Sequence, residues 1–194
     1  ERCGYCMPQE LQEWLPRHEI LTYEETLRLI RIAAELGVSK VRITGGEPLT
    51  RRGILDFVRQ IPEISGITSI GLSTNGTLLA REITPGKTMA EALSGSGVQS
   101  VNISLDTLDA AVYSQITGRD FHAQVLAGID AAIAAGFDQV KLNAVLMRGR
   151  NEDQLLPLIE FAAARNLLLR FIELMPVSTT EVLSESNFMS VTEA

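Results

Sequence analysis

The sequence is poor in cysteine, histidine and positive charge, and each shortage excludes a class of protein. Its 194 residues include two cysteines and two histidines, too few cysteines for a secreted scaffold held together by disulfides. The net charge is −7, which argues against nonspecific nucleic-acid binding, since that needs a basic surface. No apolar run approaches the roughly 20 residues of a membrane span, and no signal-peptide pattern is present. We therefore expect a cytoplasmic protein without a nucleic-acid or membrane partner.

The sequence does contain a regular alternation of strand-like and helix-like stretches. Its composition, 45% hydrophobic and 21% charged, suits one globular domain. Strands are expected at 38–43, 67–73, 98–105, 139–146 and 167–174, and helices at 22–36, 54–60, 89–93, 121–135 and 152–165. The first helix begins at a Thr-x-x-Glu capping box, Thr22 to Glu25. Five strands separated by helices predict an α/β fold of parallel β/α units.

The economical architecture is a partial (β/α)6 barrel, with its first strand expected before Cys3 and outside the chain. We expect the barrel to occupy residues 1–177. Residues 178–194 are expected to be a linker into a C-terminal domain that also lies outside the chain, and residues 80–97 a loop-rich connection. In β/α barrels the chemistry lies at the C-terminal ends of the strands, and several polar motifs fall there.

Two motifs combine small or reactive residues. Cys3-Gly-Tyr-Cys6 can hold iron, zinc or a disulfide, or can be a buried or redox pair. Thr44-Gly-Gly-Glu-Pro48 contains two glycines, which let a ligand approach the backbone because no Cβ is in the way; it can also be an ordinary β/α turn.

Polar side chains also interrupt apolar strands. Ser104 and Asp106 end one strand, where a hydroxyl and a carboxylate suit recognition of a ribose or an amine. Arg42, Lys141 and Arg170 lie within apolar strands. Each can extend harmlessly between helices, or point into the barrel and meet an anion such as a triphosphate. Arg170 can alternatively form an ion pair with a nearby glutamate, Glu173 or Glu47.

These motifs carry a resemblance. The chain resembles the N-terminal catalytic portion of the GTP 3′,8-cyclase family. Six segments carry this resemblance: Cys3 to Pro8, Val41 to Arg52, Gly71 to Gly76, Val101 to Asp106, Ile116 to Arg119 and Arg170 to Pro176. That family, also called molybdenum cofactor biosynthesis protein A, consists of radical S-adenosylmethionine (SAM) enzymes. Ser73 departs from it, because the family more often has Thr there.

The resemblance implies a set of site residues. A [4Fe–4S] cluster would be held by the catalytic residues Cys3 and Cys6 with a third cysteine four residues before Cys3, outside the chain; the full protein would carry two clusters. SAM would be positioned by Tyr5, Gly45, Gly46, Glu47, Ser104 and Met175, and GTP would be bound by Arg42, Ser73 and Lys141.

The resemblance also implies a reaction and its partners. The enzyme, a lyase, would abstract hydrogen from C3′ of GTP and form the C3′–C8 bond of 3′,8-cyclo-7,8-dihydro-GTP, the first step of molybdopterin synthesis. It would need an electron donor and a downstream pterin-synthesis enzyme; a homodimer is left open. The chain alone is expected to be inactive, because it lacks one cysteine and the second cluster. Three alternatives remain: another radical SAM enzyme with auxiliary clusters, a degenerate barrel acting as a binding protein, and a disulfide oxidoreductase.

Overall fold

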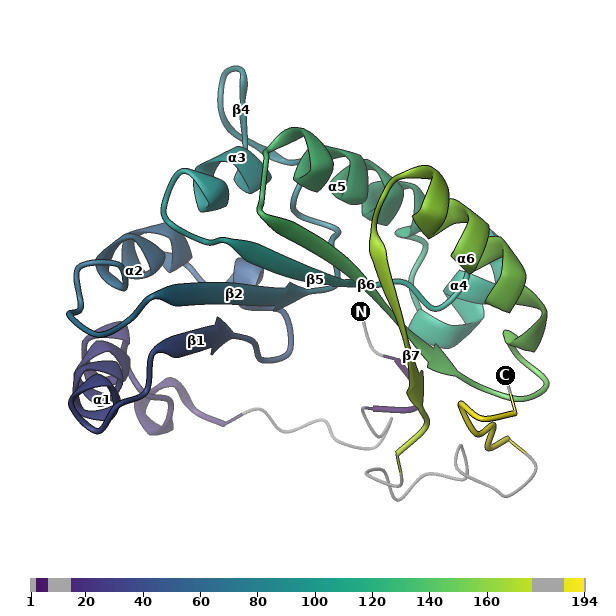
Figure 1. The fold of residues 1–194 in the computed structure, drawn as a ribbon, viewed down its shortest axis with the longest axis horizontal. Coiled ribbons are helices and arrows are strands. Elements are labelled where there is room, and N and C mark those ends of the chain that lie inside the picture. The colour runs from purple at the N-terminus through teal and green to yellow at the C-terminus, as the bar shows by residue number, and fades with distance from the viewer. Residues whose placement is uncertain (1–2, 7–14, 176–186, 194) are drawn as a thin grey trace.

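The computed structural model describes residues 3–6, 15–175 and 187–193 and is built on five parallel strands. They run in the order β1-β2-β5-β6-β7 and curve into an open, partial barrel (Figure 1). Their bounds are Lys40–Ile43 for β1, Ser69–Thr74 for β2, Ser100–Ser104 for β5, Gln139–Leu146 for β6 and Leu168–Glu173 for β7. The five expected strands and their parallel arrangement are confirmed.

Helices cover the convex face of this sheet. They are α1 (Tyr23–Glu35), α2 (Ile54–Gln60), α3 (Met89–Ser94), α4 (Ala110–Thr117), α5 (His122–Ala134) and α6 (Leu155–Ala164), with short 3-10 helices at Arg17–Glu19, Pro48–Thr50 and Glu152–Gln154. In Figure 1, α2, α3, α5 and α6 follow one another along the outer side of the strands. Among the described residues no helix lies on the concave side, so a ligand can approach the strands from there (Figure 1).

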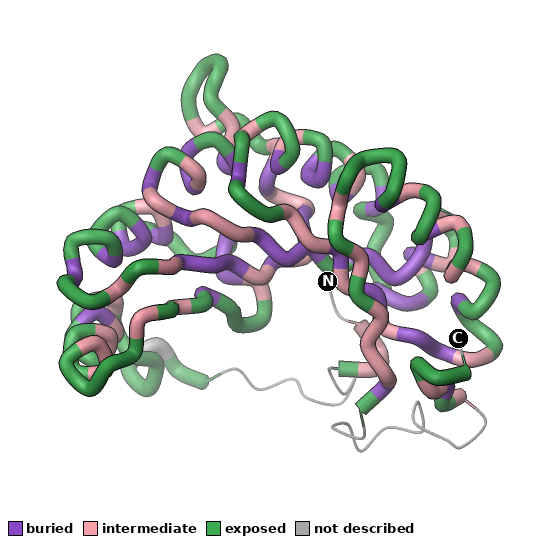
Figure 2. The backbone as a smooth tube through the Cα atoms, viewed as in Figure 1, coloured by how far each residue is buried: buried purple, intermediate pink, exposed green. Residues whose placement is uncertain are grey.

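The core lies between the strands and these helices. Side chains alternate between the two faces of a strand, and Leu72, Val101, Ile103 and Leu142 on the convex face are fully buried. They pack in one cluster with residues of α2, α3, α5 and α6, and the buried strand segments are purple in Figure 2. Because burying such a side chain contributes about 1.5–3 kcal/mol, the convex face supplies most of the hydrophobic stabilisation.

Helix α5 approaches the end of β2 at a pair of glycines. A Cβ on Gly128 would lie 2.1 Å from the carbonyl oxygen of Gly76. Gly76 itself has a φ of +83°, and a Cβ there would lie 2.7 Å from Cγ2 of Ile103. Glycine alone tolerates both conditions, so this pair fixes the distance between helix and strand.

Helix caps account for the start of two helices. The capping box at Thr22 is confirmed: its backbone amide donates to Glu25 Oε2 at 2.7 Å, and its hydroxyl accepts from the Glu25 amide at 3.2 Å. Thr88 and Glu91 form a second box at the start of α3. Each box satisfies amides that the first helical turn leaves without partners.

Three local features differ from the sequence prediction. Residues 80–97 are more ordered than a loop, because β3 (Glu82–Thr84) and β4 (Lys87–Thr88) form an antiparallel hairpin before α3. Helix α4 was not predicted; it is capped by Asp109, the residue before it, whose carboxylate accepts from the amides of Ala111 and Val112. The expected helix at 152–165 divides into a 3-10 turn and α6. Across the described ranges, no helix is both long and apolar enough to cross a membrane.

Candidate active site

The strands present a polar concave face. The register places Ser73 beside Asn102 and Asn102 beside Lys141, and in the next row it places Asn143 between Ser104 and Arg170. These side chains alternate with the buried convex ones, so they share the opposite face. Arg42 follows the same alternation on β1, where Ile43 is the buried neighbour. The arginine and lysine residues predicted within the strands therefore face one common space.

Two buried amide oxygens on this face lack a partner. Among the described residues, Asn102 Oδ1 and Asn143 Oδ1 are buried and accept no hydrogen bond. An unsatisfied buried polar atom costs about 1–3 kcal/mol. The concave face is therefore suited to a ligand that brings hydrogen-bond donors.

The cations of the concave face have no acidic partner among the described residues. Arg42 donates to Leu72 O at 3.3 Å and to Ser100 Oγ at 3.4 Å. Its guanidinium fills the space above Gly71, where a Cβ would lie 2.7 Å from Nη2. Partial burial, together with the positive charges of Arg170 and Arg42, lowers the pKa of Lys141. Positive charge is thus concentrated here without an ion pair to any acidic side chain of the described residues.

The glutamates expected as alternative partners of Arg170 are bound elsewhere. Glu47 accepts from the Thr74 hydroxyl at 2.8 Å and 2.9 Å, from the Asn75 amide at 2.7 Å and from the Leu49 amide at 3.0 Å. Glu173 accepts from the backbone amide of Val191 at 2.9 Å. In the described part of the chain, neither glutamate forms an ion pair with Arg170.

The glycine turn after β1 is open on its outer side. Gly45 and Gly46 are exposed, and, apart from the adjoining residues of the turn, no atom of the described residues lies within 4 Å of the position that a Cβ would occupy on either. The contacts of Glu47 attach this turn to the end of β2. The turn is therefore fixed to the end of β2 by Glu47, while its backbone stays accessible to a ligand on the other side.

The two cysteines lie on a short turn, residues 3–6, which we call the cysteine turn. The Cys6 amide donates to Cys3 O at 3.1 Å, and the Gly4 amide donates to Ile116 O, at the end of α4, at 3.2 Å. Cys3 is half-buried and Cys6 is exposed. No group of three metal-binding side chains lies within the described ranges; the turn itself contains two thiols, those of Cys3 and Cys6.

Tyr5, between the cysteines, reaches the end of β5. Its ring packs against Ile116, Met147 and Leu174, and its hydroxyl donates to Asp106 Oδ2 at 2.9 Å. Burial, reinforced by the Asp106 carboxylate, raises the pKa of Tyr5. No pattern in the sequence indicates this contact.

Asp106 is buried and engaged on both carboxylate oxygens. It is 5% exposed, and its Oδ1 accepts from the Val145 amide at 2.8 Å. Burial raises its pKa to about 6, which the hydrogen bonds from Val145 and Tyr5 only partly oppose. The interpretation of Asp106 as a group that recognises a ribose or an amine is contradicted by this burial, because both oxygens face protein donors.

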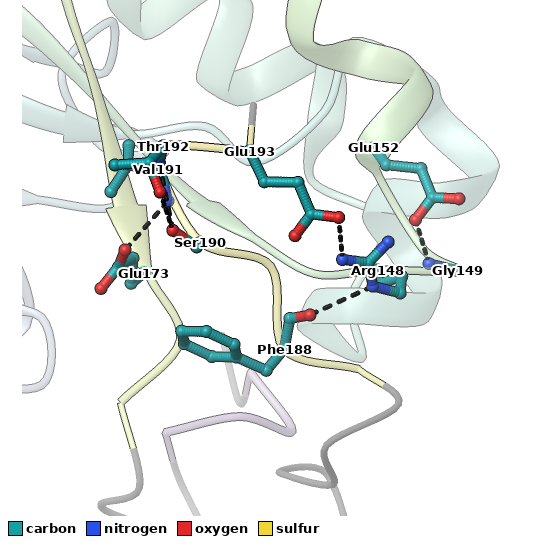
Figure 3. A network of polar contacts seen from close by, with 9 residues as sticks. All are labelled: Arg148, Gly149, Glu152, Glu173, Phe188, Ser190, Val191, Thr192 and Glu193. Carbon is teal, nitrogen blue, oxygen red and sulfur yellow. Dashed lines mark hydrogen bonds and ion pairs between the residues drawn. The ribbon is translucent and has the colours of Figure 1, made fainter.

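The segment 187–193 lies against the ends of β6 and β7. Figure 3 shows Arg148, just after β6, beside Phe188 and Glu193: Arg148 Nε donates to Phe188 O at 3.2 Å and its Nη2 contacts Glu193 Oε1 at 2.5 Å. Met189 is 8% exposed. Met175, the expected SAM neighbour at the end of β7, is 59% exposed. The rest of the expected linker, from 178 to 186 and residue 194, lies outside the described residues.

Asn143 on the concave face is a candidate residue that the sequence analysis missed. Asn143 lies two positions after Lys141 on β6 and beside Ser104 in the register. That spacing was the available signal, because residues two apart on a strand share a face. The other expected site residues lie on the concave face, on the glycine turn, on the cysteine turn or at the end of β7.

Comparisons with known proteins agree with this geometry. A family model described as "Radical SAM superfamily" matches residues 1–162. A GTP 3′,8-cyclase of Limosilactobacillus fermentum is 45% identical over 179 residues, which cover 92% of this chain and 52% of the relative. One of Thermodesulfovibrio yellowstonii is 44% identical over 177 residues, covering 91% and 53%. The chain thus spans about half the length of these curated relatives.

Solved structures share the fold. Streptococcus suis SuiB bound to S-adenosylmethionine has a TM-score of 0.68 at 23% identity, covering 92% of this chain and 39% of SuiB. TYW1 with a lysine-pyruvate adduct bound has a TM-score of 0.64 at 18% identity, covering 99% and 65%. Because the family model matches most of its length and the partial barrel agrees, the chain belongs to the radical SAM superfamily.

Proposed function

We propose that the whole protein is a GTP 3′,8-cyclase, which abstracts hydrogen from C3′ of GTP and joins C3′ to C8 to give 3′,8-cyclo-7,8-dihydro-GTP. The observation that carries this proposal is the 45% identity to a curated cyclase across 92% of the chain. The cations of the concave face, which pair with no acidic side chain in the described part of the chain, support it, because a triphosphate would supply anionic charge.

The chain offers a fitting site for the cofactors of the superfamily, a [4Fe–4S] cluster and SAM. Cys3 and Cys6 would provide two cluster thiolates, the ligand type that such clusters prefer, and a third cysteine would come from outside the chain. When bound, the cluster and SAM supply a carbon-centred radical that removes hydrogen from the substrate. The residues that would position SAM are Tyr5, Gly45, Gly46, Ser104 and Met175. Glu47 would belong to the same set by holding the glycine turn in place, since its carboxylate is bound to the end of β2.

The concave face would bind and orient GTP. Arg42, Lys141 and Arg170 would contact the triphosphate, and Ser73 would donate or accept a hydrogen bond nearby. Partial burial, together with repulsion by Arg170 and Arg42, lowers the pKa of Lys141, and a bound polyphosphate would offset that repulsion. The unpartnered amide oxygens of Asn102 and Asn143 would accept from ribose hydroxyls or base N–H groups. Holding the substrate in one orientation is the main task of the protein where cofactors supply the chemistry.

The remaining parts of the proposal concern the portion of the protein beyond this chain. A second cluster would lie in the C-terminal half of the relatives' length, with 178–194 leading toward it, and the chain alone would be inactive. An electron donor would reduce the first cluster, and a pterin-synthesis enzyme would consume the product.

The test uses whole protein reconstituted anaerobically with iron and sulfide, then given SAM, a reductant and GTP deuterated at C3′. Deuterium in 5′-deoxyadenosine, found by mass spectrometry, is the expected result. Lys141→Met should raise the KM for GTP by about ten-fold or more, whereas Lys87→Met, on the exposed outer hairpin, should not. SAM cleavage without deuterium transfer would assign another substrate, and no cleavage by an intact cluster would favour a degenerate barrel.

A further inference from the structure

The cysteine turn rests on a buried carboxylate to which the proposed reaction assigns no role. Two contacts help to attach the turn to the barrel: the Gly4 amide donates to Ile116 O, and the Tyr5 hydroxyl donates to Asp106 Oδ2. The first anchor lies on α4 and the second at the end of β5. Both come from parts of the chain more than a hundred residues away, so the position of the turn is set by tertiary contacts.

Asp106 is itself held rigidly. Its Oδ1 accepts from the Val145 amide at 2.8 Å, and its backbone carbonyl accepts from Asn151 Nδ2 at 2.8 Å. Asn151 is 1% exposed; it also donates to Val145 O and accepts from the Met147 amide, both at 2.8 Å. The ends of β5 and β6 are thus joined by one satisfied, buried network, a kind of arrangement that specifies a single geometry.

The tyrosine transmits that geometry to the cysteines. Its ring is packed against Ile116, Met147 and Leu174, which limits rotation of the side chain, and its hydroxyl is directed at the carboxylate. A charge-assisted hydrogen bond of this kind is stronger than one between neutral groups. Cys3 and Cys6 flank Tyr5 in the sequence, so any displacement of Tyr5 moves both thiols.

We propose that Asp106 is a positioning residue: through Tyr5 it sets where the Cys3 and Cys6 thiolates lie above the ends of β5 and β6, ready for an iron–sulfur cluster. The proposal rests on the cluster-binding part of the proposed function and is independent of the identity of the substrate. Asp106 acts without touching SAM or substrate, because both of its carboxylate oxygens are used by the protein.

The first experiment measures amide hydrogen exchange in the whole protein freed of iron, comparing Tyr5→Phe, Asp106→Ala and Asp106→Asn with the wild type. Ser96→Ala is the control, because it removes another buried hydroxyl, bonded to Ala92 O at 2.6 Å, in α3 and its following turn. In Tyr5→Phe and Asp106→Ala, exchange of the cysteine turn should rise about ten-fold, the effect of losing a hydrogen bond to a charged group. Exchange of β2 and α5 should not change.

Asp106→Asn should largely rescue the turn, since the amide can accept from Val145 and donate to Tyr5. The proposal would be overturned if Asp106→Asn and Asp106→Ala increased the exchange of the cysteine turn equally. It would also be overturned if Tyr5→Phe left that exchange unchanged, or if exchange increased evenly over the whole chain, which would indicate general destabilisation.

The second experiment measures the rate at which a chelator removes iron from the reconstituted whole protein. One class of iron should be released about ten-fold faster in Tyr5→Phe than in wild type or Ser96→Ala, with Asp106→Asn close to wild type. Equal release rates in all variants would overturn the link between the tether and the cluster. If both experiments give the expected results but no deuterium is transferred from GTP, the positioning role of Asp106 stands and the cyclase proposal fails.

Discussion

Replacing Asp106 with Asn should change how the stability of the protein depends on pH. Burial raises the pKa of this carboxyl group from its ordinary 3.8 to about 6, and the side chain is 5% exposed. The folded protein therefore binds this proton more tightly than the unfolded chain does. Its contribution to stability is fully present below about pH 4 and is lost as the pH rises through about 6.

The size of the effect follows from the shift. About two pKa units at 1.36 kcal/mol each correspond to roughly 3 kcal/mol. The amide of the variant does not titrate, so the free energy of unfolding of Asp106→Asn minus that of the wild type should rise by about 3 kcal/mol between pH 4 and pH 7. All other carboxyl groups are common to both proteins and largely cancel in the difference.

The assay is urea unfolding of the iron-free protein, followed by circular dichroism at several pH values. Ser96→Ala serves as the control, because it removes a buried polar group that does not titrate, and its difference from the wild type should stay flat. A difference for Asp106→Asn that is constant or falls with increasing pH would refute the assignment of a buried, destabilised carboxylate.

Three further predictions concern the turn, the glycines and the cations. Gly128→Ala should destabilise the protein by more than about 3 kcal/mol in thermal unfolding, because its Cβ would meet the Gly76 carbonyl at 2.1 Å; an unchanged melting temperature would contradict this close approach. Glu47→Ala should cost about 3 kcal/mol in urea unfolding, since it removes a carboxylate that accepts from two amides and a hydroxyl, and a loss below about 1 kcal/mol would contradict that. Gly71→Ala should displace the Arg42 guanidinium and weaken GTP binding about ten-fold by calorimetry; unaltered affinity would show that Arg42 does not contact the nucleotide.

Most of the fold could be predicted because apolar periodicity and helix caps are local signals. The strand at 139–146 and the helix at 54–60 have the predicted bounds. The hairpin could not be predicted, since strands of three and two residues are too short to show alternation. Helix α4 was missed because its eight residues span about two turns and give a weak periodic signal.

The candidate site could be predicted only in part. Arg42 and Lys141 were recognised because a cation within an apolar strand is unusual, and the register confirms that they share the concave face. Asp106 was noticed for the same reason, but its contact with Tyr5 joins residues 101 positions apart. A single sequence contains no information about such a pairing, so the carboxylate was assigned to a ligand.

The division of the sheet into an apolar and a polar face also bears on how such a protein can diverge. Fully buried positions such as Leu72 and Leu142 lie on the convex face, whereas the polar positions next to them lie on the concave one. A substitution at an exposed concave position such as Arg42 should therefore have little effect on folding, because few stabilising contacts are lost. Alternate residues of one strand are thus exposed to separate selection, and new substrate preferences can arise while the scaffold is preserved.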